Sequence, residues 1–85
     1  MNFGWALDML KRGKAVKRDG WNGSGQFVYY VPGGTYVSQT DVAKTRLGGH
    51  ARYRPYLALR TSQGDVVTWV PSVSDCLAED WSESE

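Results

Sequence analysis

The sequence predicts an α+β fold: a small antiparallel sheet with an N-terminal helix and a short C-terminal helix. Apolar residues recur at helical spacing near the start of the chain, and several later segments are rich in β-branched and aromatic residues. Glycine-rich or polar turns separate those segments. The order of helix, two strands, loop, two strands, helix and short strand indicates one domain over residues 1–85, with antiparallel neighbours.

The first helix follows Asn2, a residue suited to capping a helix. Phe3, Ala6, Leu7 and Leu10 have the spacing of one helical face, and basic residues followed by a glycine are typical of a helix end. This pattern predicts a helix of about ten residues.

Two strands come next, joined by a glycine-rich loop. "KAVKR", residues 14–18, predicts a short polar edge strand, and "QFVYYV", residues 26–31, predicts a strand with both faces covered. The loop between them places Trp21 among glycines, where side chains are normally small and polar.

Residues 32–55 have the weakest pattern, so we expect a mobile loop with a short strand at "TYV". The segments "PYLALRT" and "VVTWV" then predict a hairpin around residues 62–65. A short helix is expected from Ser72 to about Glu79, and "DWSES" predicts a final strand.

Composition favours assembly. A chain of 85 residues buries only roughly 60 to 65% of its unfolded surface, and eleven aromatic residues are too many for so thin a core. We therefore expect a homo-oligomer with aromatic side chains at subunit contacts or around a ligand.

Charge is divided along the chain. Residues 1–60 hold all ten Lys and Arg against three acids, a balance of +7, and residues 61–85 hold six acids and no base, a balance of −6. We expect the acidic end to fold back on the basic part and neutralise it. The alternative is a dedicated anionic partner, and both hold if neutralisation is incomplete around one pocket. Because the chain is only mildly basic overall, long nucleic acid is a weak candidate partner.

Groups suited to catalysis or metal binding are few, so we expect neither an enzyme nor a metal or cofactor site. His50, the only histidine, is expected to be solvated in a loop, and Cys76, the only cysteine, to be a small buried residue. The single cysteine fits a reducing compartment, for which the cytoplasm is the default expectation. The sequence predicts no signal peptide and no membrane association.

Residues suited to binding a ligand form three groups, in addition to five arginines suited to phosphate. Trp21 and Trp69 lie where strands meet loops and could stack on a base or pack in the core. Asn22 and the backbone of Gly23, Ser24 and Gly25 could donate hydrogen bonds, while Ser72, Ser74 and Asp75 could cap a helix or contact a ligand. The candidate phosphate contacts are the following arginines: Arg18, Arg46, Arg52, Arg54 and Arg60.

The segments "MNFGWALDMLKRGKAVKRDGWNG" and "DVVTWVPSVSDCLAEDW" resemble a family of small phage and prophage proteins that includes the second type of Thoeris anti-defence protein. The resemblance covers about residues 1–31 and 56–82. This chain has Trp5 where members commonly have an acidic residue.

The resemblance implies a protein that binds cyclic nucleotide immune signals and removes them without cleavage. These are notably cyclic ADP-ribose isomers, with cyclic oligonucleotides in some members, and they occupy pockets at the subunit interfaces of a homotetramer in the bacterial host cell. By the same resemblance Trp21 and Trp69 stack on the ligand, Asn22 and Asp75 contact its polar edges, and Ser74 assists. The main alternative is a structural or protein-interaction module whose aromatic residues serve only interfaces.

Overall fold

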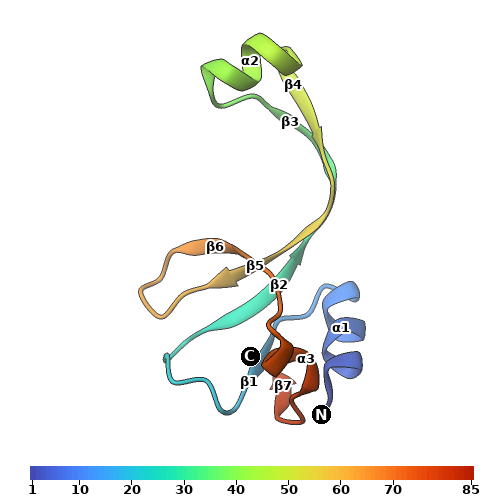
Figure 1. The fold of residues 1–85 in the computed structure, drawn as a ribbon, viewed down its shortest axis with the longest axis vertical. Coiled ribbons are helices and arrows are strands. Elements are labelled where there is room, and N and C mark those ends of the chain that lie inside the picture. The colour runs from blue at the N-terminus through green and yellow to red at the C-terminus, as the bar shows by residue number, and fades with distance from the viewer.

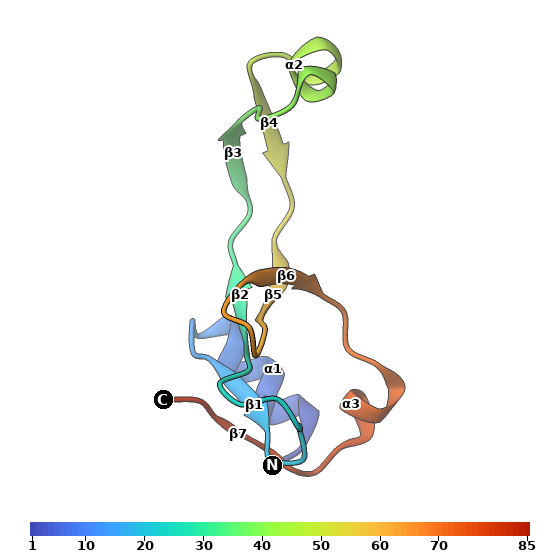
Figure 2. The same ribbon diagram turned by 90° about the vertical axis from the view of Figure 1, so that its left-hand side faces the viewer.

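The computed structural model describes all 85 residues, which form a body and an arm that projects from it (Figures 1 and 2). The body holds the five-stranded sheet β6-β5-β2-β1-β7 together with α1 and α3, and the arm holds the two-stranded sheet β3-β4 with α2. The molecule is 44 Å long and 26 by 24 Å across. Its elements have these bounds: α1 Phe3–Lys11, β1 Val16–Arg18, β2 Phe27–Val31, β3 Gly34–Val37, α2 Asp41–Leu47, β4 His50–Tyr53, β5 Tyr56–Arg60, β6 Val66–Trp69, α3 Val73–Leu77 and β7 Trp81–Glu83.

The predicted α+β fold is confirmed, with one helix more than expected. The Asn2 side chain caps α1 by accepting a hydrogen bond from the Trp5 backbone N–H at 2.9 Å. Ala6 and Leu10 of the predicted apolar face are fully buried. The spacing of apolar residues therefore predicts this helix correctly, together with two of the side chains that it buries.

The prediction that residues 14–18 form an edge strand is wrong. β1 lies between β2 and β7, and β7 pairs with it antiparallel so that Arg18 faces Trp81 across the ladder. The chain returns more than 60 residues later to add this outer strand, which no local pattern around β1 reveals. The expected final strand itself is confirmed as β7.

The hairpin of β5 and β6 is confirmed, and its turn is closed by a hydrogen bond from the Thr61 N–H to the Asp65 carbonyl oxygen at 2.8 Å. α3 begins after Ser72 as expected but ends at Leu77, before the predicted Glu79. Cys76 is exposed on α3, so the prediction that it is buried is wrong: this short helix buries only Asp75.

Residues 32–55, which we call the arm, form a hairpin with a helix between its strands and not the expected loop. The short strand at "TYV" is confirmed as part of β3, which pairs with β4 over four residues. Thr40 caps α2, and Ser38 is buried and donates to the Gly48 carbonyl oxygen at 2.8 Å. His50 is exposed, as expected, but it belongs to β4 and not to a loop.

The core lies between α1 and the sheet of the body. It consists of five buried side chains: Ala6, Leu10, Val16, Val28 and Trp81. Only nine of the 85 residues are buried, so the chain alone covers little apolar surface. None of its helices has the length and apolar character needed to cross a membrane.

Candidate functional site

The glycine loop, residues 19–26, connects β1 to β2 and is held near both ends by side chains of the body. The Gly20 N–H donates to Asp80 Oδ2 at 2.8 Å, and a Cβ at position 20 would lie only 2.8 Å from the same oxygen. Gly25 has φ +73° and its carbonyl oxygen accepts from Arg60 Nη1 at 3.0 Å. Glycine is therefore needed at both positions, for close approach at one and for backbone conformation at the other.

Trp21 packs edge-on against Trp81, with ring centroids 5.5 Å apart and planes at 78°. Trp69, at the end of β6, lies beside both rings, at 6.5 Å from Trp21 and 6.1 Å from Trp81. Trp81 is only 1% exposed, whereas Trp21 and Trp69 are half-buried. Trp21 thus closes the edge of the core while part of its ring stays open to another molecule.

Arg18 joins the glycine loop to the C-terminal segment through two carboxylates. Its Nη1 donates to Asp75 Oδ1 at 3.0 Å and its Nε to Asp80 Oδ1 at 2.9 Å. Asp75 also accepts from the Ser72 N–H at 3.0 Å, and its own N–H donates to Ser72 Oγ, which completes a capping box at α3. The Asp75 carbonyl oxygen accepts from Trp81 Nε1 at 2.9 Å.

These contacts fix the charge of all three groups. Burial acts to raise the pKa of Asp75, but hydrogen bonds from the Ser72 backbone and from Arg18 outweigh it and lower that pKa below its ordinary value. Hydrogen bonds from Arg18 and then Gly20 lower the pKa of Asp80. The hydrogen bonds to Asp80 and then to Asp75 raise the pKa of Arg18, so the three groups stay charged at neutral pH.

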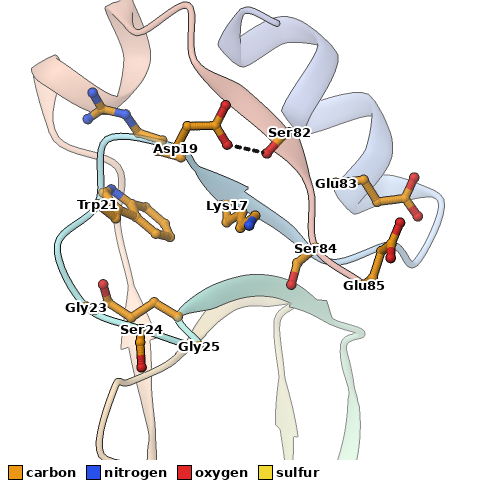
Figure 3. Close-up of a pocket in the computed structure, with 12 residues that line it drawn as sticks. Lys17, Asp19, Trp21, Gly23, Ser24, Gly25, Ser82, Glu83, Ser84 and Glu85 are labelled. Atoms are coloured by element: carbon orange, nitrogen blue, oxygen red, sulfur yellow. Dashed lines mark hydrogen bonds between the residues drawn. The ribbon is translucent and has the colours of Figure 1, made fainter.

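A hollow of about 630 Å³, which we call the loop pocket, lies between the glycine loop and the C-terminal segment (Figure 3). Its volume is in the range of small-molecule sites. Trp21 stands on one side of it, and Asp19 accepts a hydrogen bond from Ser82 Oγ at 2.8 Å on another. Its lining consists of Lys17, Arg18, Asp19, Trp21, Gly23, Ser24, Gly25, Gln26, Ser82, Glu83, Ser84 and Glu85.

Of the seven residues predicted as ligand contacts, three line the loop pocket: Arg18, Trp21 and Gly23. Four do not: Asn22, Trp69, Ser74 and Asp75. Asn22 and Ser74 are exposed, and Trp69 lies against the Trp21 ring. Asp75 is 8% exposed and its carboxylate is occupied by Arg18 and Ser72. That each of these seven residues contacts a ligand directly remains a prediction.

Sequence reasoning missed the part of the lining that the C-terminal segment supplies. Ser82, Ser84 and the acidic residues beside them reach the loop pocket because β7 pairs with β1. The charge division of the sequence held the one signal for this arrangement, since it indicated that the acidic end folds onto the basic part.

Charge in the loop pocket is close to balanced, with two cations against three carboxylates. Arg18 is already paired with Asp75 and Asp80, which leaves Lys17 as the one cation of the lining outside an ion pair. The other candidate phosphate contacts lie elsewhere: Arg60 holds the glycine loop, and Arg46, Arg52 and Arg54 are on the arm. The pocket therefore offers hydroxyl, amide and aromatic groups but little positive charge.

Two comparisons with known proteins cover nearly the whole chain. Residues 1–84 match the family model described as Tad2-like, Thoeris anti-defense 2-like domain. The chain is also 33% identical over 81 residues to the protein named Thoeris anti-defense 2 from Bacillus phage SP01, an alignment that spans 95% of this chain and 91% of that protein. The family match includes the arm, the glycine loop and all seven predicted contact residues.

Proposed function

This chain belongs to the Thoeris anti-defense 2-like family, and from that premise we propose that it is a phage or prophage protein that counters the Thoeris defence of bacteria. It binds a cyclic nucleotide that carries the defence signal, a cyclic ADP-ribose isomer, and keeps it from its receptor in the cytoplasm of the host cell. Cyclic oligonucleotide signals are further candidate ligands. The name of the phage relative supports the anti-defence role, and the geometry of the loop pocket supports a ligand of this size.

The observation that carries the proposal is the position of Trp21. Its ring is half-buried against Trp81, and its remaining surface borders the loop pocket beside the backbone of Gly23 and Gly25. A half-covered indole gives a base or ribose a surface to stack on, which is worth about 1–3 kcal/mol per base. Backbone amides of the glycine loop are a further source of hydrogen bonds to polar edges of the same ligand.

We propose that the ligand is held and not cleaved. The lining offers serine hydroxyls, backbone amides, carboxylates and Lys17, while His50 lies on the arm and Cys76 on the exposed side of α3. Sequestration then depends on affinity alone, and a dissociation constant of about 1 nM corresponds to roughly 12 kcal/mol. One stacked tryptophan supplies a small part of that, so several further contacts are needed.

A second copy of the chain is the natural source of those contacts. Twelve large hydrophobic side chains are exposed, among them Val70, Val73 and Leu77 on the body and Val42 and Leu47 on the arm. Their number supports a homo-oligomer, which we propose is a tetramer with ligand pockets at subunit interfaces.

The alternative is a structural or protein-interaction module, and the same exposed hydrophobic residues favour it. In that case the residues around the loop pocket would serve assembly alone. The two functions differ in whether a small molecule binds.

Native mass spectrometry of the purified protein with a cyclic ADP-ribose isomer tests the proposal. We expect the assembly to gain the mass of the ligand, and Trp21→Ala to assemble but to bind the ligand more weakly. Trp5→Ala is the matched control, since it removes a half-buried indole from α1, away from the loop pocket. An assembly that stays unliganded with every cyclic nucleotide tried would favour the interaction module.

A further inference from the structure

One wall of the loop pocket carries a linked pair of side chains, Asp19 and Ser82. The Ser82 hydroxyl donates to Asp19 Oδ1 at 2.8 Å, and both residues line the pocket together with Trp21 (Figure 3). Ser82 lies opposite Lys17 in the ladder of β1 and β7, on the face of the sheet away from the buried Val16. Asp19 continues that face just past the end of β1, so the pair borders the pocket and not the core.

The backbone holds both members of the pair in place. The Asp19 N–H donates to the Asp80 carbonyl oxygen at 3.0 Å. Ser82 is the middle residue of β7, which pairs with β1 over three residues. Because both side chains start from fixed backbone and one orients the other, a ligand that binds them has little ordering cost to overcome.

The pair presents acceptor oxygens and no donor. Ser82 gives its only hydroxyl proton to Asp19, so its oxygen can do no more than accept from a third group. The Asp19 carboxylate is an acceptor, its Oδ2 has no hydrogen-bond partner in the chain, and none of the three ion pairs includes it. Two neighbouring oxygens are thus free to accept, next to a negative charge that no cation neutralises.

Ribose is the part of a nucleotide that matches such a surface. Its two neighbouring hydroxyls are donors, and a carboxylate that accepts from ribose hydroxyls recurs in nucleotide sites. Phosphate groups are acceptors and carry negative charge, so they are repelled from this wall. A base stacked on Trp21 leaves its ribose beyond the edge of the indole, where Asp19 and Ser82 border the same pocket.

We propose that Asp19 and Ser82 bind the hydroxyls of a ribose whose base stacks on Trp21, and that they thereby set the orientation of the ligand in the loop pocket. The pair makes the pocket selective for ribose over deoxyribose and turns the phosphates of the ligand away from this wall. This inference rests on the proposed function for the class of ligand alone.

Binding of adenosine and of 2′-deoxyadenosine, followed by NMR at the Trp21 indole N–H, gives the first test. A hydrogen bond to a charged group is a strong one, so we expect wild type to bind adenosine roughly tenfold more tightly, and Asp19→Ala to lose most of that preference. Glu79→Gln is the control, since it removes an exposed carboxylate that is outside the pocket lining and in no ion pair. The same preference in wild type and Asp19→Ala, or no binding of either nucleoside to wild type, would overturn the proposal.

Substitutions of Ser82 test the pair as a unit. Ser82→Ala removes one acceptor and leaves Asp19 free to rotate, so the preference for adenosine should fall. Ser82→Thr keeps the hydroxyl in a residue suited to a strand, and should restore it. A wild-type preference in Ser82→Ala would overturn the paired role.

Inosine separates recognition of the ribose from recognition of the base. It keeps the ribose of adenosine but has a carbonyl group in place of the amino group of adenine. We expect Asp19→Ala to weaken the binding of inosine and adenosine equally. A difference between adenosine and inosine that disappears in Asp19→Ala would assign the carboxylate to the base and overturn the assignment to ribose.

A cyclic ADP-ribose isomer separates this inference from the proposed function. Asp19→Ala should bind it roughly tenfold more weakly than wild type does. If wild type distinguishes the two nucleosides through Asp19 but binds no cyclic nucleotide, the proposed function fails and ribose recognition stands. If Asp19→Ala binds the cyclic isomer and both nucleosides as wild type does, ribose recognition fails and the proposed function stands.

Discussion

Arg18 and Asp80 join the start of the glycine loop to the C-terminal segment: Arg18 Nε donates to Asp80 Oδ1 at 2.9 Å, while Oδ2 of the same carboxylate accepts the Gly20 N–H at 2.8 Å. A single side chain thus holds both the end of β1 and the turn that carries Trp21. The path of the loop, and with it one wall of the loop pocket, depends on a residue 60 positions away in the sequence.

Asp80→Asn should loosen this loop without unfolding the body. The amide keeps the shape of the side chain but loses the charge that strengthens both hydrogen bonds. We expect faster hydrogen exchange at the Gly20 and Trp21 amides and weaker ligand binding, with α1 unchanged. Exchange rates equal to wild type across residues 19–26 would contradict this role of Asp80.

Gly20→Ala should destabilise the protein, whereas Gly49→Ala should not. An added Cβ at position 20 would lie 2.8 Å from Asp80 Oδ2, while at position 49 it would meet no atom within 4 Å. Relieving this contact moves the Asp80 carboxylate away from the Gly20 N–H and from Arg18 Nε, and so weakens the two hydrogen bonds that it accepts. Urea unfolding of both variants measures the difference, and equal stabilities would mean that Asp80 moves aside freely.

Among the aromatic residues, truncation of Trp81 should lower the free energy of unfolding most. It is 1% exposed, contacts Phe3, Trp21 and Trp69, and donates Nε1 to the Asp75 carbonyl oxygen. We expect Trp81→Ala to lower the free energy of unfolding by about 3–5 kcal/mol. Trp81→Phe keeps most of the apolar volume, so its cost should be smaller and should reflect the lost hydrogen bond, about 1–3 kcal/mol. A loss under about 1 kcal/mol for the alanine variant would place Trp81 outside the core.

Stability should fall in acid because the pKa values of Asp75 and Asp80 are lower in the folded chain than their ordinary value of 3.8. Such groups stabilise the fold at pH above 3.8, and the contribution is lost as the pH falls through 3.8 toward the lowered values. Urea unfolding should therefore show a decrease below about pH 4 that is smaller in Asp80→Asn. An equal decrease in acid for wild type and Asp80→Asn would contradict this contribution of Asp80.

The elements of the body could be predicted because each has a local signal. Asn2 and the apolar spacing of residues 3–10 indicate α1, and the β-rich segments around residues 62–65 indicate the hairpin. The arm lacked such a signal: β3 and β4 pair over only four residues, and neither α2 nor β3 has a buried face to produce a hydrophobic period. The place of β1 inside the sheet depends on the distant pairing with β7, so a local pattern could not reveal it.

The site could be predicted in part. Trp21 was found because a large aromatic residue is unusual among glycines, and the structure places it at the wall of the loop pocket. Asp75 was expected either to cap a helix or to contact a ligand, and the capping box is confirmed. Its ion pair with Arg18 joins residues 57 positions apart, a contact that only the folded chain shows.

The most direct test of sequestration is the fate of the bound molecule. The protein is incubated with a cyclic ADP-ribose isomer, separated from free ligand, denatured by heat, and the released molecule is identified by mass spectrometry and chromatography. We predict release of the intact cyclic nucleotide in proportion to protein, and less of it from Trp21→Ala. Release of a hydrolysed product would contradict sequestration by showing turnover, and release of no nucleotide from wild type would contradict ligand binding itself.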